Sequence, residues 1–544
     1  MSEKYLNDET PDVFTEVPKT SSDNSVSLID SNEFAQLTDA DQHLAQMGYK
    51  PVLKREFSMF SAFSFAVSIS GLFATVATTF SYPLIAGGAA SVIWTWVISG
   101  IGCMCISLSV AELVSAYPTA GGMYFTCSYV APKKYMALIS WMDGWLNFLG
   151  QIAGIASSDY GAAQLLLAAV SMGSDFTYVP TTQHTVAVMA GILLFHGIIN
   201  SMSTKFLEKV TNGYVILHIG VLVSGCIALL VMQDDKHDAK YVFTNVESSS
   251  GWNPIGFSFL FGFLSVSWSM TDSDATAHVC EEMTEPEKKA PWAIAYAMSF
   301  TYFVGILLNI VLVFCMGDPA EILASPVDQP VAQIFYNVLG KKGGIFYTVM
   351  AFFIMNFVAI TAIHACSRTV WAFSRDQMLP FSRVWYRINK FSGVPVNSVW
   401  LTVISCILIN LIALGSYTTI AAIFNVCAIA IDWSYCIPIL CKIFGGNFQP
   451  GPWNLGRASI FVNSWACLWT LFVSIIFVLP TVRPVTADSM NYAAVFFVGI
   501  GVFAAVYWYV AGRKYYTGPR KNTQVVDGLK QNPGATTTER LFTE

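Results

Sequence analysis

Composition places this chain outside the ordinary soluble proteins. Of its 544 residues, 54% are hydrophobic, 14% aromatic and 12% charged, whereas soluble domains carry about 25% charged residues. We therefore expect a protein that crosses a membrane several times. The formal net charge is -6 without a basic patch, which argues against nucleic acid as a partner. The sequence also lacks the common nucleotide, catalytic-serine and paired-histidine metal motifs, so we expect neither an enzyme nor a bound cofactor.

Both ends of the chain are polar. Residues 1–56 contain eleven acids and five bases, with too few large apolar side chains to fold alone. We predict a disordered cytoplasmic N-terminal tail over 1–56. We expect no cleavable signal peptide, because the first apolar run begins only at Phe57. A second cytoplasmic tail is predicted over 512–544.

Apolar windows long enough to cross about 30 Å of hydrocarbon, near 20 residues each, recur twelve times. They lie near 58–82, 90–113, 135–170, 184–202, 206–232, 253–278, 291–316, 344–372, 397–415, 418–441, 459–480 and 491–511. We predict an all-α polytopic membrane protein with twelve transmembrane helices. The first five form one repeat (57–232), the next five a second (253–441), and the last two are appended (459–511).

The basic residues of the loops predict the orientation, because Lys and Arg favour the cytoplasmic side. If both termini are inside, the inner loops hold twelve of them: Lys133, Lys134, Lys205, Lys209, Lys288, Lys289, Arg375, Arg383, Arg387, Lys390, Lys442 and Arg457. The outer loops hold five: Lys236, Lys240, Lys341, Lys342 and Arg483. We predict that both termini are cytoplasmic. We expect the plasma membrane, with the vacuolar and endoplasmic reticulum membranes as alternatives.

The sixth window carries too many polar residues for one plain transmembrane helix. Between 265 and 274 it has three serines at alternate positions, then Thr271, Asp272, Ser273 and Asp274, whose side chains compete with the helical hydrogen bonds. Such a break is tolerated in a membrane only where it lines a cavity or lies inside protein. We predict a broken helix that binds substrate. The alternative is a helix that ends near Met270, with both acids in a solvated loop.

A matching break is predicted in the first window, at 67–72, where Gly71 follows two serines. Each break lies a similar distance from the start of its window, and five windows separate the two starts. An odd number of spans inverts the second unit relative to the first. The two breaks would then face each other near the middle of the bilayer, as in transporters built from inverted repeats.

Four stretches resemble a known family. They are AELVSAYPTAGGMYFTCSYVAP at 111–132, LAQMGYKPVLKREFS before the first window, WSMTDSDATAHVCEEMTEPEKKAPWAI from Trp268, and SRTVWAFSRDQMLP at 367–380. These are similar to the amino acid/polyamine/organocation permease superfamily. They are most similar to its fungal amino acid/choline permeases, which carry 4-aminobutyrate, choline or thiamine. The resemblance covers roughly residues 44–516.

The resemblance implies the leucine-transporter fold, with a 5+5 inverted repeat and broken helices 1 and 6. It also implies a substrate site between spans 1 and 6, walled by spans 3, 8 and 10. Trp268 matches an aromatic residue that closes over the substrate in relatives. Many relatives have an aromatic residue or Glu two positions before Ala275, where this chain has Ser273, and Asp272 is an additional acid. This departure leaves the substrate open.

A zwitterionic or cationic substrate needs donors for a carboxylate and acceptors or aromatic faces for an ammonium. Backbone amides at the first break suit a carboxylate, because a half-helix N-terminus favours anions. Backbone carbonyls at the second break, the Trp268 ring and Asp272 suit the ammonium. Trp268 packing without substrate contact, and Asp274 as a helix cap, remain alternatives. The predicted substrate-binding residues are Ser68, Ser70, Gly71, Leu72, Gln151, Ser265, Ser267, Trp268, Ser269 and Asp272.

Coupling to protons needs a group whose charge can change near working pH, for which histidine is suited. We predict coupling or gating roles for Asp274, His218, Glu112 and His364. The expected partners are a small amino acid or amine, protons and the lipid bilayer. The favoured function is a proton symporter for an amino acid or small amine such as 4-aminobutyrate, working by alternating access. The alternatives are a choline or thiamine permease, or a nutrient sensor of the same fold.

Overall fold

The computed structural model describes residues 27–414, 418–486, 489–520 and 523–526. The chain forms two units. One is the continuous stretch Pro51–Arg520, and the other combines the two terminal segments, Met1–Lys50 and Lys521–Glu544.

The described part of the Pro51–Arg520 unit is built from helices, as predicted. Its α-helices and 3₁₀ turns, in chain order, are α3 (Met59–Ser70), α4 (Leu72–Thr79), α5 (Ser81–Ala116), α6 (Met123–Val130), α7 (Met136–Gly173), α8 (Thr182–Asn200), α9 (Thr204–Met232), α10 (Ala239–Thr244), α11 (Ile255–Phe259), η1 (Leu260–Gly262), α12 (Phe263–Ser269), α13 (Ala275–His278), η2 (Cys280–Glu282), α14 (Pro286–Cys315), α15 (Pro319–Leu323), α16 (Pro330–Arg375), α17 (Ser382–Trp385), α18 (Val396–Leu411), η3 (Ile412–Leu414), α19 (Thr418–Gly445), η4 (Gly456–Ala458), α20 (Ser459–Phe477), α21 (Ala493–Val510) and η5 (Gly512–Lys514). Two of the long helices are kinked, α5 at Gly87–Gly88 and α16 at Gly340.

Nine helical stretches within the described residues are long and apolar enough to cross a membrane. The other three predicted windows coincide with α7, with the series α11–η1–α12, and with α18. The all-α polytopic membrane class is therefore confirmed. The total of twelve crossings and the inversion of one repeat relative to the other stay predictions.

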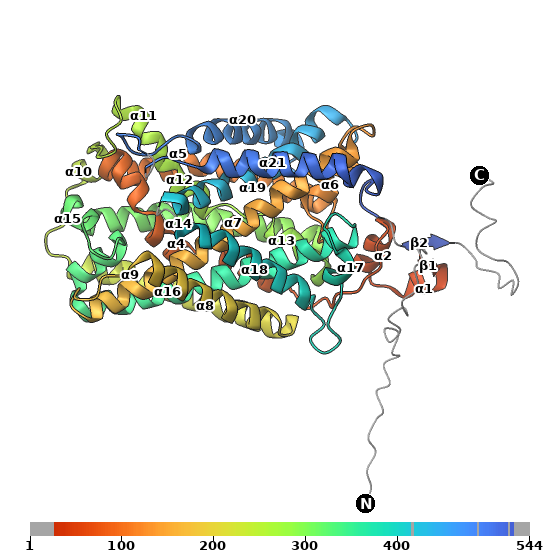
Figure 1. Cartoon of the computed structure of the whole chain (residues 1–544), viewed down its shortest axis with the longest axis horizontal. Helices are drawn as coiled ribbons and strands as arrows, with labels where there is room; N and C mark the ends of the chain where they lie inside the picture. Colours follow the sequence, from red (N-terminus) through yellow and green to blue (C-terminus); the bar gives the residue numbers. More distant parts are fainter. Residues whose placement is uncertain (1–26, 415–417, 487–488, 521–522, 527–544) are drawn as a thin grey trace, which may run out of the picture. The chain divides into compact units, whose positions relative to one another are not determined.

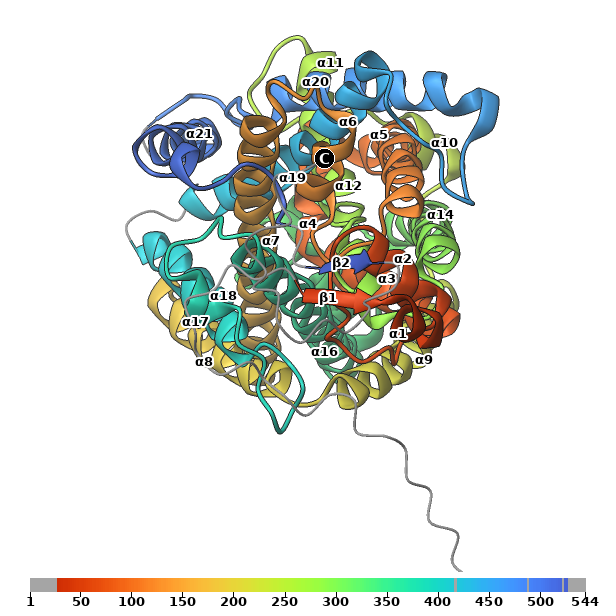
Figure 2. The same ribbon diagram turned by 90° about the vertical axis from the view of Figure 1, so that its right-hand side faces the viewer.

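The long helices lie side by side (Figure 1). Seen end-on, α4 and α12 are near the middle, whereas α8, α9 and α21 form part of the rim (Figure 2). The rim helices expose large apolar side chains, among them Phe195, Ile216 and Val495. A helix that presents apolar side chains outward suits lipid, because all its backbone groups are bonded within the helix.

Helices α3 and α4 are separated by the first predicted break. Helix α3 ends at Ser70, and Gly71 adopts a left-handed conformation (φ 44°, ψ 42°) before α4 begins at Leu72. Glycine reaches this conformation without the steric cost that a Cβ atom brings. The second predicted break is also present, because α12 ends at Ser269 and α13 begins at Ala275.

The terminal unit contains an element that the sequence did not indicate. Strand β1 (Ser27–Asp30) pairs in parallel with β2 (Thr523–Val526), and two short helices follow β1, α1 (Ser31–Gln36) and α2 (Asp39–Gln46). The prediction of disorder over 1–56 is thus wrong for residues 27–46. Each tail alone lacks a partner, and the strand forms only when both tails meet. Residues 1–26 lie outside the described part of the chain.

Packing between α5 and α14 predicts a stability effect. A Cβ atom added at Gly305 would lie 2.1 Å from the ring of Trp96, which is fully buried. Overpacking of this kind costs about 1–3 kcal/mol, so Gly305→Ala should lower the melting temperature of the detergent-solubilised protein. Gly499→Ala is the matched control, because no atom lies within 4 Å of its added Cβ. Equal melting temperatures for both variants would contradict this packing.

Candidate functional site

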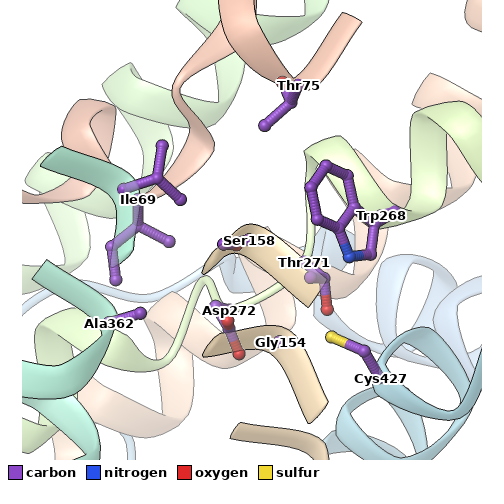
Figure 3. Close-up of a pocket in the computed structure, with 10 residues that line it drawn as sticks. Ile69, Thr75, Gly154, Ser158, Trp268, Thr271, Asp272, Ala362 and Cys427 are labelled. Atoms are coloured by element: carbon purple, nitrogen blue, oxygen red, sulfur yellow. The ribbon is translucent and has the colours of Figure 1, made fainter. Parts of the chain in front are cut away.

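A cavity lies where the two breaks meet, with about 320 Å³ of empty space. It is walled by α3, α4, α7, α16, α19 and the segment around the second break (Figure 3), through Ile69, Thr75, Gly154, Ser158, Trp268, Thr271, Asp272, Val358, Ala362 and Cys427. A smaller cavity of about 190 Å³ shares Ile69, Asp272 and Ala362 with it and adds Gln151. Of the predicted binding residues, Trp268 and Asp272 line the larger cavity, and Asp272 and Gln151 line the smaller one.

The first break is held by backbone bonds and close packing. The Gly71 amide donates to the Val67 carbonyl at 3.1 Å, so it is not free for a carboxylate as we had predicted. The left-handed turn folds this amide back to cap α3. A Cβ atom at Gly71 would lie 2.1 Å from Val358 Cγ2, which means that α16 approaches this turn closely.

His218 on α9 caps the start of α4. Its Nε2 accepts the Phe73 amide hydrogen at 3.2 Å, and Tyr214 Oη lies 3.2 Å from its Nδ1. The ring is fully buried. An accepting Nε2 carries no hydrogen, so the neutral ring bears it on Nδ1. His218 therefore stabilises the first break directly, in a position where gaining a proton would displace the cap.

The other predicted residues of the first break point to neighbouring helices. Ser68 Oγ lies 2.7 Å from Thr361 Oγ1 on α16, and Ser70 Oγ bonds the Val67 carbonyl and Thr301 Oγ1 of α14. Leu72 is the buried first residue of α4. None of the three lines the two cavities.

The second break leaves a carboxylate without a protein partner. Asp272 has a left-handed backbone (φ 56°), and its carbonyl accepts the Ala275 amide hydrogen at 3.0 Å. Its Oδ1 is buried and has no hydrogen-bond partner within the described residues. The opposite wall makes room for it, because a Cβ atom at Gly154 would lie 3.1 Å from Asp272 Oδ2. Figure 3 shows the carboxylate in the cavity beside Gly154.

Trp268 forms one wall of the cavity. Its Nε1 donates to Ser157 Oγ on α7 at 3.1 Å, and its ring centroid lies 4.7 Å from that of Phe424 on α19. The indole is therefore fixed by contacts on two sides, with one edge toward the cavity (Figure 3).

The three serines of α12 do not line either cavity. Ser265 Oγ lies 2.8 Å from Thr79 Oγ1 and Ser267 Oγ lies 3.5 Å from Ser99 Oγ, while Ser269 Oγ donates to the Ser265 carbonyl at 2.7 Å. These bonds join α12 to α4 and α5 and satisfy the hydroxyls inside the helix bundle.

Asp274 belongs to a buried polar network. Its Oδ1 accepts from Tyr435 Oη at 2.5 Å, and its Oδ2 accepts from Asn147 Nδ2 at 2.8 Å and lies 3.1 Å from His278 Nε2. Gln151 Nε2 lies 2.8 Å from the same His278 nitrogen. Asp274 is therefore paired on both oxygens, whereas Asp272 faces the cavity.

His364 and Glu112 are held away from the cavity. His364 Nε2 lies 3.3 Å from Glu282 Oε2. The other oxygen of Glu282, Oε1, accepts from Arg368 Nε at 2.7 Å. Glu112 on α5 pairs with Lys442 and accepts from Ser459 Oγ at 2.9 Å. Glu112 thereby ties α5 to α19 and α20.

Sequence reasoning overlooked three polar residues of the site. Thr75 and Ser158 line the cavity, and His278 contacts Asp274. His278 follows Asp274 by four residues, a spacing that places two side chains on one helix face, so this signal was present. Among the described residues, no three His, Cys, Asp or Glu side chains gather as a metal site.

Comparison with known proteins agrees with this architecture. A family model described as amino acid permease matches residues 57–503. An uncharacterized amino-acid permease of Schizosaccharomyces pombe is 58% identical over 497 residues, 91% of this chain and 92% of that protein. Amino-acid permease 2 of Neurospora crassa is 50% identical over 480 residues, 88% of this chain and 89% of that protein.

A GABA-specific permease of Saccharomyces cerevisiae is 30% identical over 498 residues, 90% of this chain and 87% of that protein. The predicted resemblance to fungal permeases is confirmed by these relatives. They are transport proteins by name rather than enzymes, and the apolar helices agree with an integral multi-pass membrane protein. The chain belongs to the amino acid permease family.

Proposed function

We propose that this permease is a proton symporter whose substrate is an amino acid with a free ammonium group, 4-aminobutyrate among the candidates. The observation that carries the proposal is the Asp272 carboxylate, which faces a cavity between two helix breaks with one oxygen unpartnered within the described residues. Buried charges are paired in native proteins. An ammonium in the cavity would supply the missing partner.

The remaining walls suit the rest of such a substrate. The Trp268 ring borders the same space, and an aromatic face adds about 0.5–2 kcal/mol of attraction for a cation. Ser158 on α7 also lines the cavity, and its hydroxyl would donate to the carboxylate of such a substrate. The 30% identity to a GABA-specific permease supports 4-aminobutyrate as the first compound to test.

An organic cation is a second candidate. No positively charged side chain within the described residues pairs with Asp272, so a ligand that carries only a positive charge, such as choline or thiamine, would also neutralise it. The two candidates differ in hydrogen bonding, because a quaternary ammonium has no N–H to donate. Competition by choline and by 4-aminobutyrate in one uptake assay separates them.

Transport by alternating access is supported by the way one side of the cavity is closed. On the side we predict as cytoplasmic, Glu281 pairs with Arg375 at 3.0 Å and Glu282 pairs with Arg368 at 2.7 Å, and all four side chains are buried. Opening this side would separate the ion pairs. We propose that both termini lie in the cytoplasm and that the plasma membrane is the site of function.

Proton coupling is proposed for the buried titratable groups beside the breaks. His218 caps the first break and Asp274 follows the second, so both are placed to sense a change at the cavity. His364 and Glu112 lie in the ion-paired region away from it, where we propose roles in gating.

Substitution of Asp272 tests the ammonium site. Loss of a charge-assisted hydrogen bond costs about 1.5–3 kcal/mol, so Asp272→Asn should raise the KM for substrate uptake about 10- to 100-fold. Asp234→Asn removes an exposed acid and should leave uptake unchanged. The measurement is uptake of labelled 4-aminobutyrate, amino acids and choline by transporter-deficient cells. An unaltered KM for Asp272→Asn would remove the ammonium site.

Two substitutions of Trp268 distinguish a ring that contacts substrate from a ring that only packs against its neighbours. Trp268→Phe keeps an aromatic face but loses the bond to Ser157, and we expect reduced uptake. Trp268→Ala loses the wall itself, and we expect no uptake while surface expression persists. If Trp268→Ala transports as well as Trp268→Phe, the indole only fills space.

The driving ion is tested in the same cells. A protonophore should collapse accumulation. Replacing sodium in the buffer with potassium should have no effect; choline, a candidate substrate, is not used as the substitute cation. Accumulation that follows sodium would contradict proton symport. Absence of uptake for every compound, with binding retained, would favour the alternative of a nutrient sensor.

A further inference from the structure

His278 is a buried residue whose ring nitrogens face three polar groups. Its Nδ1 lies 2.9 Å from the Ala120 carbonyl, and its Nε2 lies 3.1 Å from Asp274 Oδ2 and 2.8 Å from Gln151 Nε2. A neutral ring with its hydrogen on Nδ1 donates to Ala120 and accepts from the Gln151 amide. A hydrogen bond between Nε2 and Asp274 needs an additional proton, either on the ring or on the carboxylate.

From these contacts we infer that the Asp274–His278 pair is the proton-binding site of the transport cycle, and that its proton decides whether Nε2 bonds Asp274 or Gln151. The inference rests on the proposed proton symport. With the proton present, Nε2 bonds Asp274. Without it, the Nε2 lone pair faces the ionised carboxylate and accepts only from Gln151, so Asp274 must move away from the ring.

The loop between α5 and α6 holds the ring in place. The Ala120 amide donates to Glu281 Oε1 at 3.1 Å, so both backbone groups of Ala120 are held by side chains that follow the second break. Gly122 has φ 59°, and a Cβ atom there would lie 2.6 Å from His278 Cε1. The ring is thus packed against the loop. Its Nδ1 contact with the Ala120 carbonyl keeps the hydrogen of the neutral ring on Nδ1, so Nε2 is the nitrogen that gains or loses the proton.

Substrate is connected to the same proton through Gln151. The Gln151 side chain lines the smaller cavity together with Asp272, and its Nε2 lies 2.8 Å from His278 Nε2. Its Oε1 is buried without a partner in the described part of the chain. Rotation of this amide would present Oε1 to a protonated Nε2. A ligand that contacts Gln151 therefore selects one amide orientation, and with it one protonation state, and this coupling is reciprocal.

Other titratable groups surround the pair and take part in its charge balance. They are Asp272 on the same segment, Asp143 on α7, Tyr435 and Asp432 on α19, Cys366 on α16, and Glu281 with its partner Arg375. Tyr435 donates to Asp274 and holds it in place. The described residues put no Lys or Arg side chain in contact with Asp274, so the ring is its source of positive charge.

The test uses the full-length protein in proteoliposomes with labelled 4-aminobutyrate, or with a labelled amino acid mixture if that compound is not carried. Exchange is measured with equal pH on both sides, and accumulation is measured with an inward proton gradient. For the unsubstituted protein, a proton should change substrate affinity by about 5- to 150-fold. His278→Gln should exchange substrate at a similar rate at low and high pH and should fail to accumulate it.

His196→Gln is the matched control. His196 is equally buried, and its Nδ1 lies 2.9 Å from Asp159 Oδ1 and its Nε2 2.9 Å from Asn356 Oδ1. It is therefore also flanked by two acceptors, but within the described residues it contacts neither the loop nor Gln151. This variant should still accumulate substrate. If His278→Gln fails to fold, Asp274→Asn, which removes the carboxylate of the pair, is judged by the same two measurements.

The outcomes separate the two proposals. Exchange without response to the gradient in the unsubstituted protein contradicts proton symport itself. Gradient-driven accumulation by His278→Gln equal to that of the unsubstituted protein overturns the assignment of the proton site alone. Equal loss of accumulation in His278→Gln and His196→Gln also overturns it, because the effect would then not depend on the contacts with Asp274 and Gln151.

Discussion

The absence of water from the hydrocarbon region decides how this chain can be interrupted. Every backbone group freed by a break in a helix must find a partner inside the protein. At the first break, the Gly71 amide bonds Val67 and the Phe73 amide bonds His218. At the second, the Asp272 carbonyl bonds the Ala275 amide. With these backbone groups satisfied, Asp272 Oδ1 is left without a partner among the described residues and its side chain lines the cavity.

The membrane spans and the two helix breaks were predictable, because each depends on residues that are neighbours in the sequence. Apolar windows marked the spans, and Gly71 and the polar run 265–274 marked the breaks. The run of serines was misleading in detail, because their hydroxyls bond neighbouring helices rather than line the cavity. A hydroxyl can be satisfied by any carbonyl or hydroxyl within reach. An ionised carboxylate is costly to bury without a counter-charge, and Asp272 is the predicted acid that lines the cavity.

Contacts between residues far apart in the sequence could not be predicted from local sequence patterns. The Ala120 carbonyl is 158 residues from His278 along the chain, and a spacing rule could pair the ring with Asp274 but not with this loop. The partner of Trp268 Nε1, Ser157, lies on α7 and was likewise hidden. The strand pairing of the two tails follows the same rule, because neither tail carries enough apolar surface to reveal it.

That pairing has a practical meaning for anyone who edits this permease. Since Ser27–Asp30 and Thr523–Val526 form one two-stranded ribbon, deleting either tail strips its neighbour of backbone partners and leaves an open edge. A truncation of the N-terminal tail and a truncation of the C-terminal tail would then disturb the same two-stranded ribbon. A reporter fused close to one strand is best judged by whether the other strand is still protected from a protease.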